Sequence, residues 1–160
     1  MRIALYQPDI PQNAGTILRL AACLGVAADV VEPAGFRLGD ARFRRALMDY
    51  GGSLDLTRHV SWEAFLGTVG TARLVLLTTA ATASLYDAAF RPDDILLLGR
   101  ESAGVPEPVH DRADLRLKVP MVAGARALNV AAAAAMALGE ALRQTGGFGH
   151  SRPHQHGAPP

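Results

Sequence analysis

Residues 119–144 read "VPMVAGARALNVAAAAAMALGEALRQ" and combine many small residues with a long run of alanines. A loop of small residues carries Arg126 and Asn129 into an alanine-rich helix, which we expect over about residues 128–144. Alanine has the highest helix propensity, and its short side chain lets a helix pack closely against its neighbours. A loop with so few large side chains leaves its backbone free to approach a ligand. We therefore predict a structural helix preceded by a binding loop.

Short apolar runs alternate with helical patterns in the rest of the chain. Several of the runs are apolar on both faces, as in the buried strands of a parallel sheet, and the runs lie at residues 2–7, 28–32, 73–79, 94–98 and 115–119. The helical patterns lie at residues 14–24, 41–50 and from about Ser61 to Val69. This alternation predicts an α/β domain, with helices on both faces of a mostly parallel sheet. We expect this single domain to span residues 1–145.

Local residue types predict where the helices begin and end. Asn13 can cap the first helix and Gly25 can end it, and Ser61 is a favourable cap for the third helix. Cys23 lies among apolar residues of the first helix, so we expect a buried structural thiol. As the single cysteine of the chain, it excludes an intrachain disulfide.

The composition is typical of a globular protein without membrane segments. Of the 160 residues, 49% are hydrophobic and 19% are charged, and no apolar run reaches the length of a membrane span. The start of the chain lacks the pattern of a signal peptide, so we expect a cytoplasmic protein. Residues 146–160, "GGFGHSRPHQHGAPP", predict a disordered tail. The tail histidines fit solvated residues better than a metal site, and we expect no metal.

The charge is balanced over the chain but not within each segment. The formal net charge of +1 argues against binding of nucleic acid through a global basic field. Locally, Arg37, Arg42, Arg44 and Arg45 stand against only Asp40. Arginine suits phosphate recognition, but an arginine-rich, lysine-poor chain also follows from genomic base composition. Both explanations stay open.

Common catalytic signatures are absent from the sequence. There is no G-x-x-x-x-G-K-[ST], and "YQPDIPQNAG" stands after the first predicted strand in place of a G-x-G-x-x-G. There is also no H-E-x-x-H, no G-x-S-x-G and no zinc-type cluster of cysteine and histidine. These absences argue against nucleotidases of the phosphate-loop type, Rossmann-type cofactor sites, and the usual hydrolases and metalloenzymes.

Three separated stretches resemble, in order and spacing, the motifs of the SPOUT superfamily of RNA methyltransferases. They are "LYQPDIPQNAGTILRLAACLG", "LLLGRESAGVP" and the opening stretch, residues 119–144. The sequence is most similar to the small single-domain tRNA (cytidine/uridine) 2'-O-methyltransferases that modify the wobble nucleotide. The segments "EPAGFRLGDARFRRALMDY" and "TRHVSWEAFL" agree as well, so the resemblance covers roughly residues 2–144.

The resemblance implies a C-terminal trefoil knot, which is a rare exception to the rule that chains do not thread. It also implies a homodimer that uses S-adenosylmethionine (AdoMet) as methyl donor, without a metal. AdoMet would bind in a bent shape within the knot loops, mainly through backbone groups of Leu77, Thr78, Gly99, Arg100, Glu101, Gly104, Val119, Met121, Ala127 and Leu128. Gly99 and Gly104 would allow the ligand to come close, although Gly99 also fits a simple strand end.

The same resemblance implies three catalytic residues for methyl transfer to a ribose 2'-hydroxyl. Arg19 would reach into the partner subunit's site, hold an RNA phosphate and stabilise the negative charge that develops on oxygen. A guanidinium stays protonated, so Arg19 is a poor general base. Glu101 would lie near the cationic sulfur or form a surface salt bridge. Asn129 would hold the ribose or cap the last helix.

Contacts to RNA are implied for a partly overlapping set, namely Asn13, Arg19, Arg42, Arg45 and Arg126. Together such arginines would make binding strongly dependent on salt. For Arg42 and Arg45, an ordinary solvated helix face is an equally good interpretation.

The chain departs from the family pattern within its motifs. Ala127, Ala131, Ala132 and Gly139 replace the usual serine, serine, asparagine and tyrosine, and Arg100 and Ala103 replace a proline and an arginine. Cofactor binding through the backbone should tolerate such side-chain changes, whereas the selectivity for RNA and the rate of methyl transfer are more sensitive to them. Two alternatives therefore stay open: a catalytically weakened RNA-binding or ribosome-associated protein, and a methyltransferase for ribosomal RNA. The absence of an extra RNA-binding domain argues against the second.

Overall fold

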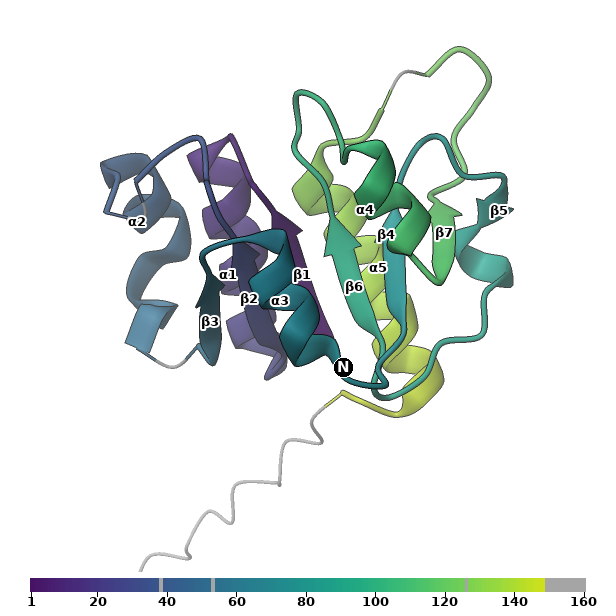
Figure 1. The fold of residues 1–160 in the computed structure, drawn as a ribbon, viewed down its shortest axis with the longest axis horizontal. Helices are drawn as coiled ribbons and strands as arrows, with labels where there is room; N and C mark the ends of the chain where they lie inside the picture. The colour runs from purple at the N-terminus through teal and green to yellow at the C-terminus, as the bar shows by residue number, and fades with distance from the viewer. Residues whose placement is uncertain (38, 53, 126, 149–160) are drawn as a thin grey trace, which may run out of the picture.

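A computed structural model describes residues 1–148 except positions 38, 53 and 126 (Figure 1). The strands are β1 (Arg2–Tyr6), β2 (Ala27–Val31), β3 (Leu56–His59), β4 (Leu74–Leu77), β5 (Ala83–Ser84), β6 (Ile95–Leu98) and β7 (Leu115–Lys118). The helices are α1 (Pro11–Leu24), α2 (Ala41–Leu47), α3 (Trp62–Val69), α4 (Glu107–Arg112) and α5 (Val130–Thr145), with short 3-10 helices η1 (Met48–Gly52) and η2 (Leu85–Asp87).

The strands form one 7-stranded sheet in the order β3-β2-β1-β6-β4-β7-β5. Every pairing within it is parallel, as the apolar runs predict. Near the carboxyl end of β1, Leu5 lies opposite Val30 on one side and Leu98 on the other. Because β1 lies between β2 and β6, the loops that follow these three strands meet at one edge of the sheet.

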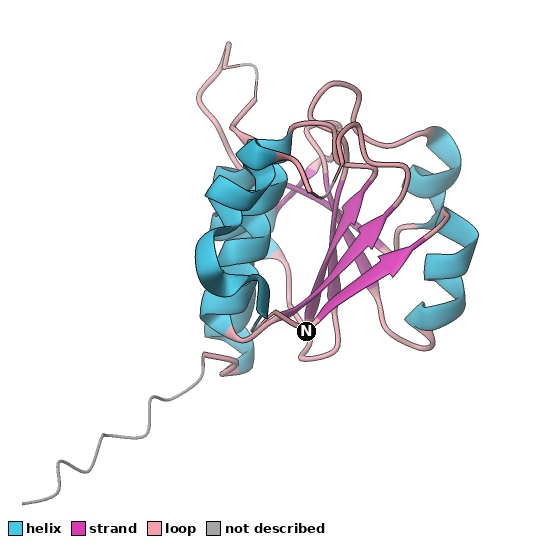
Figure 2. Ribbon diagram, turned by 90° about the vertical axis from the view of Figure 1, so that its left-hand side faces the viewer, coloured by secondary structure: helices cyan, strands magenta, loops and turns pink. Residues whose placement is uncertain are grey.

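Helices cover both faces of the sheet, which confirms the predicted α/β class (Figure 2). On one face, α1, α2 and α5 pack against a core that includes Leu96 and Leu98. On the other face, α3 and α4 pack against Ile95 and Leu97. The alternation of these four residues between the two cores is the period of two expected for a strand buried on both sides. The predicted threading of the C-terminal part as a trefoil knot remains a prediction.

The helix ends agree with the predicted caps at two of three positions. Gly25 ends α1 with φ 66°, and the Ser61 hydroxyl accepts a hydrogen bond from the amide of Ala64 at the start of α3. The prediction that Asn13 caps α1 is wrong, because the helix already begins at Pro11. Proline lacks the N–H that a cap would satisfy and has a φ suited to the first helical position.

Two other expectations need correction, and three short elements were not predicted. The helix predicted over residues 41–50 ends at Leu47, because Met48 has a φ of 55° and η1 follows. Cys23 is exposed rather than buried. The edge strand β3, the short β5 and the 6-residue α4 were not predicted. They are too short to show a hydrophobic period, and two of the four residues in β3 are exposed.

The predicted tail falls mostly outside the described residues. Gly146 ends α5 with a left-handed φ of 64°, close to the expected boundary. Residues 149–160, with His150, His154 and His156, lie outside the described part. Within the described part, no helix is both long enough and apolar enough to cross a bilayer.

Candidate active site

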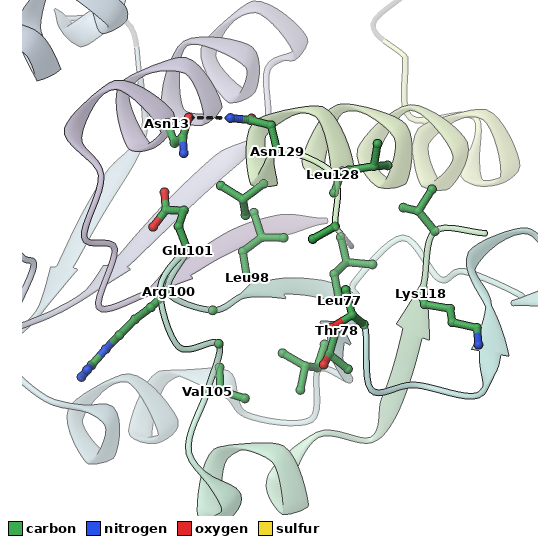
Figure 3. A pocket seen from close by; sticks show the side chains of 18 of the residues that line it. Asn13, Leu77, Thr78, Leu98, Arg100, Glu101, Val105, Lys118, Leu128 and Asn129 are labelled. Atoms are coloured by element: carbon green, nitrogen blue, oxygen red, sulfur yellow. Dashed lines mark hydrogen bonds between the residues drawn. The ribbon is translucent and has the colours of Figure 1, made fainter. Parts of the chain in front are cut away.

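A pocket of about 480 Å³ lies at the carboxyl ends of β4, β6 and β7 (Figure 3). Ligands of open α/β sheets bind at this edge, beyond the strand ends. The segments after the three strands and the first turns of α1 and α5 form its walls. All ten residues predicted to bind cofactor line it: Leu77, Thr78, Gly99, Arg100, Glu101, Gly104, Val119, Met121, Ala127 and Leu128. Their role as ligands stays a prediction.

One wall is a tight turn between Gly99 and Gly104. The amide of Arg100 donates to the Gly104 carbonyl over 3.0 Å, and the amide of Gly104 donates back over 2.9 Å. A Cβ atom on Gly99 would lie 2.7 Å from the carbonyl carbon of Gly104, and Gly104 has a φ of 64°. Both glycines are therefore required by the closure of the turn itself. The approach of a ligand is not needed to explain them.

Arg100 contributes its backbone rather than its side chain to the pocket. Figure 3 shows the side chain directed away from the pocket, and its guanidinium carbon lies 5.9 Å from the centre of the Tyr6 ring. A cation over an aromatic face is attracted by the ring quadrupole. The arginine that replaces the family's proline thus leaves the pocket open.

Asp9, in the loop after β1, and Glu101 bind each other's main chain. The Asp9 amide donates to Glu101 Oε2 over 3.3 Å, and the Glu101 amide donates to Asp9 Oδ1 over 3.0 Å. Hydrogen bonding with the Glu101 side chain, followed by bonds from Ser102 and the Glu101 amide, lowers the pKa of Asp9 to about 2. Burial, followed by the bond to Asp9, raises the pKa of Glu101. The pair therefore carries its first negative charge on Asp9.

Asn13 and Asn129 meet at the junction of α1 and α5. Asn129 Oδ1 accepts hydrogen bonds from the amides of Ala131 and Ala132, so Asn129 caps α5. Its Nδ2 donates to Asn13 Oδ1 over 2.9 Å (Figure 3). Of the two roles left open for Asn129, the structure describes the cap, and the ribose contact stays a prediction.

Arg19, Arg42 and Arg45 do not line the pocket of their own chain. Arg19 is exposed on α1, and its Nη1 donates to Met48 Sδ over 2.9 Å. Arg42 and Arg45 are exposed on α2, where Arg42 forms an ion pair with Asp40. Position 126, the remaining predicted RNA contact, lies outside the described residues. The structure thus gathers Glu101, Asn129 and Asn13 at the pocket, but not Arg19, Arg42 or Arg45.

Comparison with known proteins identifies the family of this chain. The profile of the SpoU rRNA methylase family matches residues 1–139. The chain belongs to the SpoU rRNA methylase family. One relative in this family, the tRNA (cytidine(34)-2'-O)-methyltransferase of Beijerinckia indica subsp. indica, is 62% identical over 146 residues, which cover 90% of this chain and 91% of that protein.

Solved structures of SpoU-family and related proteins share the fold. One, described as "Structural insights into the 2-OH methylation of C/U34 on tRNA", has a TM-score of 0.86 and 44% identity, and the match covers 89% of this chain and 94% of that chain. Another is the SpoU methyltransferase AviRb from Streptomyces viridochromogenes in complex with AdoMet, with a TM-score of 0.83 and 29% identity. That match covers 90% of this chain and 57% of the AviRb chain.

The pocket of this SpoU-family protein fits a nucleoside-sized ligand. Its volume lies in the range of small-molecule sites, which is about 300–1,000 Å³. Leucine, valine and methionine side chains form much of its surface, and polar side chains such as Asn13, Glu101 and Lys118 lie among them. Among the described residues, no group of acidic, histidine and cysteine side chains could hold a metal ion.

Sequence reasoning missed several residues of this SpoU-family pocket. Ile10, Thr79 and Leu117 lie beside predicted positions, so only exact element ends would have identified them. Lys118, the only lysine in the chain, also lines the pocket, and Figure 3 places it on the opposite side from Glu101. Asp9, which lies behind Glu101 and does not line the pocket, was also missed, because its position beside Glu101 depends on β1 and β6 being neighbours.

Proposed function

We propose that this protein is an AdoMet-dependent tRNA 2'-O-methyltransferase that modifies the ribose of the wobble nucleotide 34, a cytidine or a modified uridine. The single observation that carries the proposal is the pocket, where three loops far apart in sequence bring ten expected cofactor residues together. The names of the 62% identical relative and of the matched C/U34 structure support the choice of substrate. The AviRb complex supports the choice of methyl donor.

AdoMet supplies a methyl group on a cationic sulfur. The backbone of the Gly99–Gly104 turn and of the loop before α5 would hold the adenosyl part, and the apolar side chains of Leu77, Leu98 and Leu117 would exclude water from it. Glu101 would place a carboxyl group near the sulfur, where a negative charge favours a cation. In the transfer, the 2'-oxygen of the ribose would form a bond to the methyl carbon while the carbon–sulfur bond breaks to leave S-adenosylhomocysteine, and the hydroxyl proton would pass to water.

The active enzyme would be a homodimer, because Arg19 is exposed and outside the pocket of its own chain. The exposed sides of α1 and α5 include Cys23, Ala132, Ala135 and Met136. Small and apolar residues of this kind let helices of two subunits approach closely, and a second copy would bring its Arg19 to the pocket. Arg42 and Arg45, together with Arg126, would hold RNA phosphates. We further infer a knotted domain over residues 1–145, a short tail beyond it, and a cytoplasmic location.

Methyl transfer to a defined nucleotide tests the proposed function. Purified protein is incubated with labelled AdoMet and tRNA that lacks modification at position 34, and the product is digested to nucleosides. The expected result is label on the 2'-oxygen of nucleotide 34, lost when that nucleotide carries a 2'-deoxyribose. Label on a base, or transfer to ribosomal RNA and to no tRNA, would contradict the proposal.

A further inference from the structure

We propose that Asp9 is a positioning residue of this site, which holds Glu101 in place at the pocket and thereby favours a cationic ligand over a neutral one. This inference rests on the proposed binding of AdoMet. Asp9 itself does not line the pocket, so it acts through Glu101.

The Asp9 carboxylate binds the turn that carries Glu101. Its Oδ1 accepts from the Glu101 amide over 3.0 Å, and its Oδ2 accepts from the Ser102 amide over 3.3 Å and from the Ser102 hydroxyl. Hydrogen bonds to a charged acceptor are stronger than those between neutral groups. One side chain thus fixes two successive amides at the start of the turn.

The same residue also fixes the Glu101 side chain. The Asp9 amide donates to Glu101 Oε2 over 3.3 Å, while the Glu101 amide donates to Asp9 Oδ1. The backbone of each residue therefore binds the carboxyl group of the other. Among the described residues, no salt bridge involves Glu101. In the described part of the chain, the position of Glu101 therefore depends on the loop after β1.

Asp9 is itself held in place by the segment that follows β2. The Gly35 amide donates to the Pro8 carbonyl over 2.8 Å, and a Cβ on Gly35 would lie 2.9 Å from the Asp9 Cα. Such contact between two backbones leaves the loop after β1 little room to move. Asp9 is therefore a rigid support for Glu101 and not a flexible surface carboxylate.

Two carboxyl groups held next to each other favour a cation nearby. The pKa of Asp9 is lowered to about 2, so Asp9 is ionised at neutral pH, and its charge adds to that of Glu101. AdoMet is a sulfonium cation, whereas S-adenosylhomocysteine (AdoHcy), which remains after transfer, has a neutral thioether. The arrangement therefore favours release of the product over release of the donor.

The ratio of the two affinities tests the proposal. Isothermal titration gives the Kd of AdoMet and of AdoHcy for the wild type and for Asp9→Asn, with Ser102→Ala as a milder variant. We expect Asp9→Asn to lower the affinity for AdoMet about 10-fold, which is ~1.4 kcal/mol, and to lower the affinity for AdoHcy much less. Equal weakening of both ligands, or no change in either, would overturn the proposal.

A double-mutant cycle shows whether Asp9 acts through Glu101. If it does, Asp9→Asn has little further effect on the AdoMet affinity once Glu101→Gln is present, because coupled residues are not additive. Additive effects would mean that Asp9 acts independently, and would contradict the inference.

Asp114→Asn is the matched control. Asp114 Oδ2 accepts from the Leu74 amide over 2.8 Å at the opposite edge of the sheet, so the substitution replaces a charged acceptor of a backbone amide by a neutral one outside the pocket. We expect this variant to keep the wild-type affinity ratio.

Hydrogen exchange separates failure of this inference from failure of the proposed function. The amides of Glu101 and Ser102 should exchange faster in Asp9→Asn, with or without ligand. If the wild type binds no AdoMet, the proposed function and the ligand preference both fail, and exchange alone decides whether Asp9 positions the turn. If the wild type binds AdoMet but exchange and the affinity ratio do not change in Asp9→Asn, only the role of Asp9 is wrong.

Discussion

Asn129 Nδ2 donates a hydrogen bond to Asn13 Oδ1 over 2.9 Å, and this bond joins the first turns of two helices that are 116 residues apart in the chain. The oxygen of the same Asn129 amide caps α5. One side chain thus accepts hydrogen bonds from the first free amides of α5 and also holds the start of this helix against α1 beside the pocket. An asparagine does both because it offers a donor and an acceptor together.

Substitution of Asn129 separates these two functions. Asn129→Ala removes the cap and the bridge, and we expect it to lower the free energy of unfolding by about 1 kcal/mol or more. Asn129→Asp keeps a good cap but loses the donor, so it should recover most of the stability and still bind AdoMet more weakly. Urea unfolding and titration measure the two effects. Equal stability of Asn129→Ala and the wild type would contradict the role of the cap.

Gly99→Ala should open the turn at the pocket. The added Cβ would lie 2.7 Å from the Gly104 backbone, which cannot move aside without breaking the pair of bonds between Arg100 and Gly104. We expect lower stability and loss of AdoMet binding by titration. Gly139→Ala is the control, because nothing lies within 4 Å of its Cβ and alanine favours the helix by about 0.5–1 kcal/mol. A Gly99→Ala variant that binds AdoMet normally would show that the turn tolerates a side chain.

Arg19→Ala should reduce turnover without affecting the pocket. Loss of a donor that stabilises charge in the transition state lowers kcat by about 100-fold or more. Because Arg19 is exposed and lies outside its own pocket, stability and the AdoMet Kd should stay at wild-type values. These quantities are measured on the purified variant, and unchanged turnover would remove Arg19 from the mechanism.

Mixed dimers show whether Arg19 acts across the subunit interface. Arg19→Ala and Glu101→Gln homodimers should both have low activity. A mixed dimer contains one site with neither substitution if Arg19 comes from the partner, and activity then returns. If Arg19 acts within its own chain, mixing restores nothing.

AdoMet affinity should rise with pH. Burial, followed by the bond to Asp9, raises the pKa of Glu101 above 4.5, and only the ionised form attracts a cation. The Kd of AdoMet should therefore fall as the pH increases through this raised pKa, whereas that of AdoHcy should change little. Titrations from pH 4.5 upward test this, and Glu101→Gln should flatten the profile. An equally steep profile for AdoHcy would exclude the charge of Glu101 as the cause.

The pair has opposite effects on stability in acid. The pKa of Asp9 is lowered from 3.8 to about 2, so its contribution is present above pH 3.8 and is lost as the pH falls toward 2. Glu101, with a raised pKa, stabilises the fold below pH 4.5, and this contribution is lost as the pH rises through its folded pKa. The Asp9→Asn variant should therefore not show the loss of stability that the wild type shows as the pH falls from 3.8 toward 2.

Much of the site could be predicted because its residues follow strands. The loops after β4, β6 and β7 each start where an apolar run ends, and parallel strands place such loops at one edge of a sheet. Matching motifs then identified residues such as Leu77, Gly99 and Leu128 within those loops. Local patterns also identified the caps at Gly25 and Ser61.

Periodicity and capping are local properties, so the α/β class, five of the seven strands and the loops that form the pocket could be predicted from the amino-acid sequence alone. Only the tertiary structure decided that Asp9 binds Glu101, that Asn13 pairs with Asn129 instead of capping α1, and that Cys23 is exposed. The physical reason is strand order. Because β1 lies between β2 and β6, residues about ninety positions apart become neighbours, and no local pattern encodes that contact.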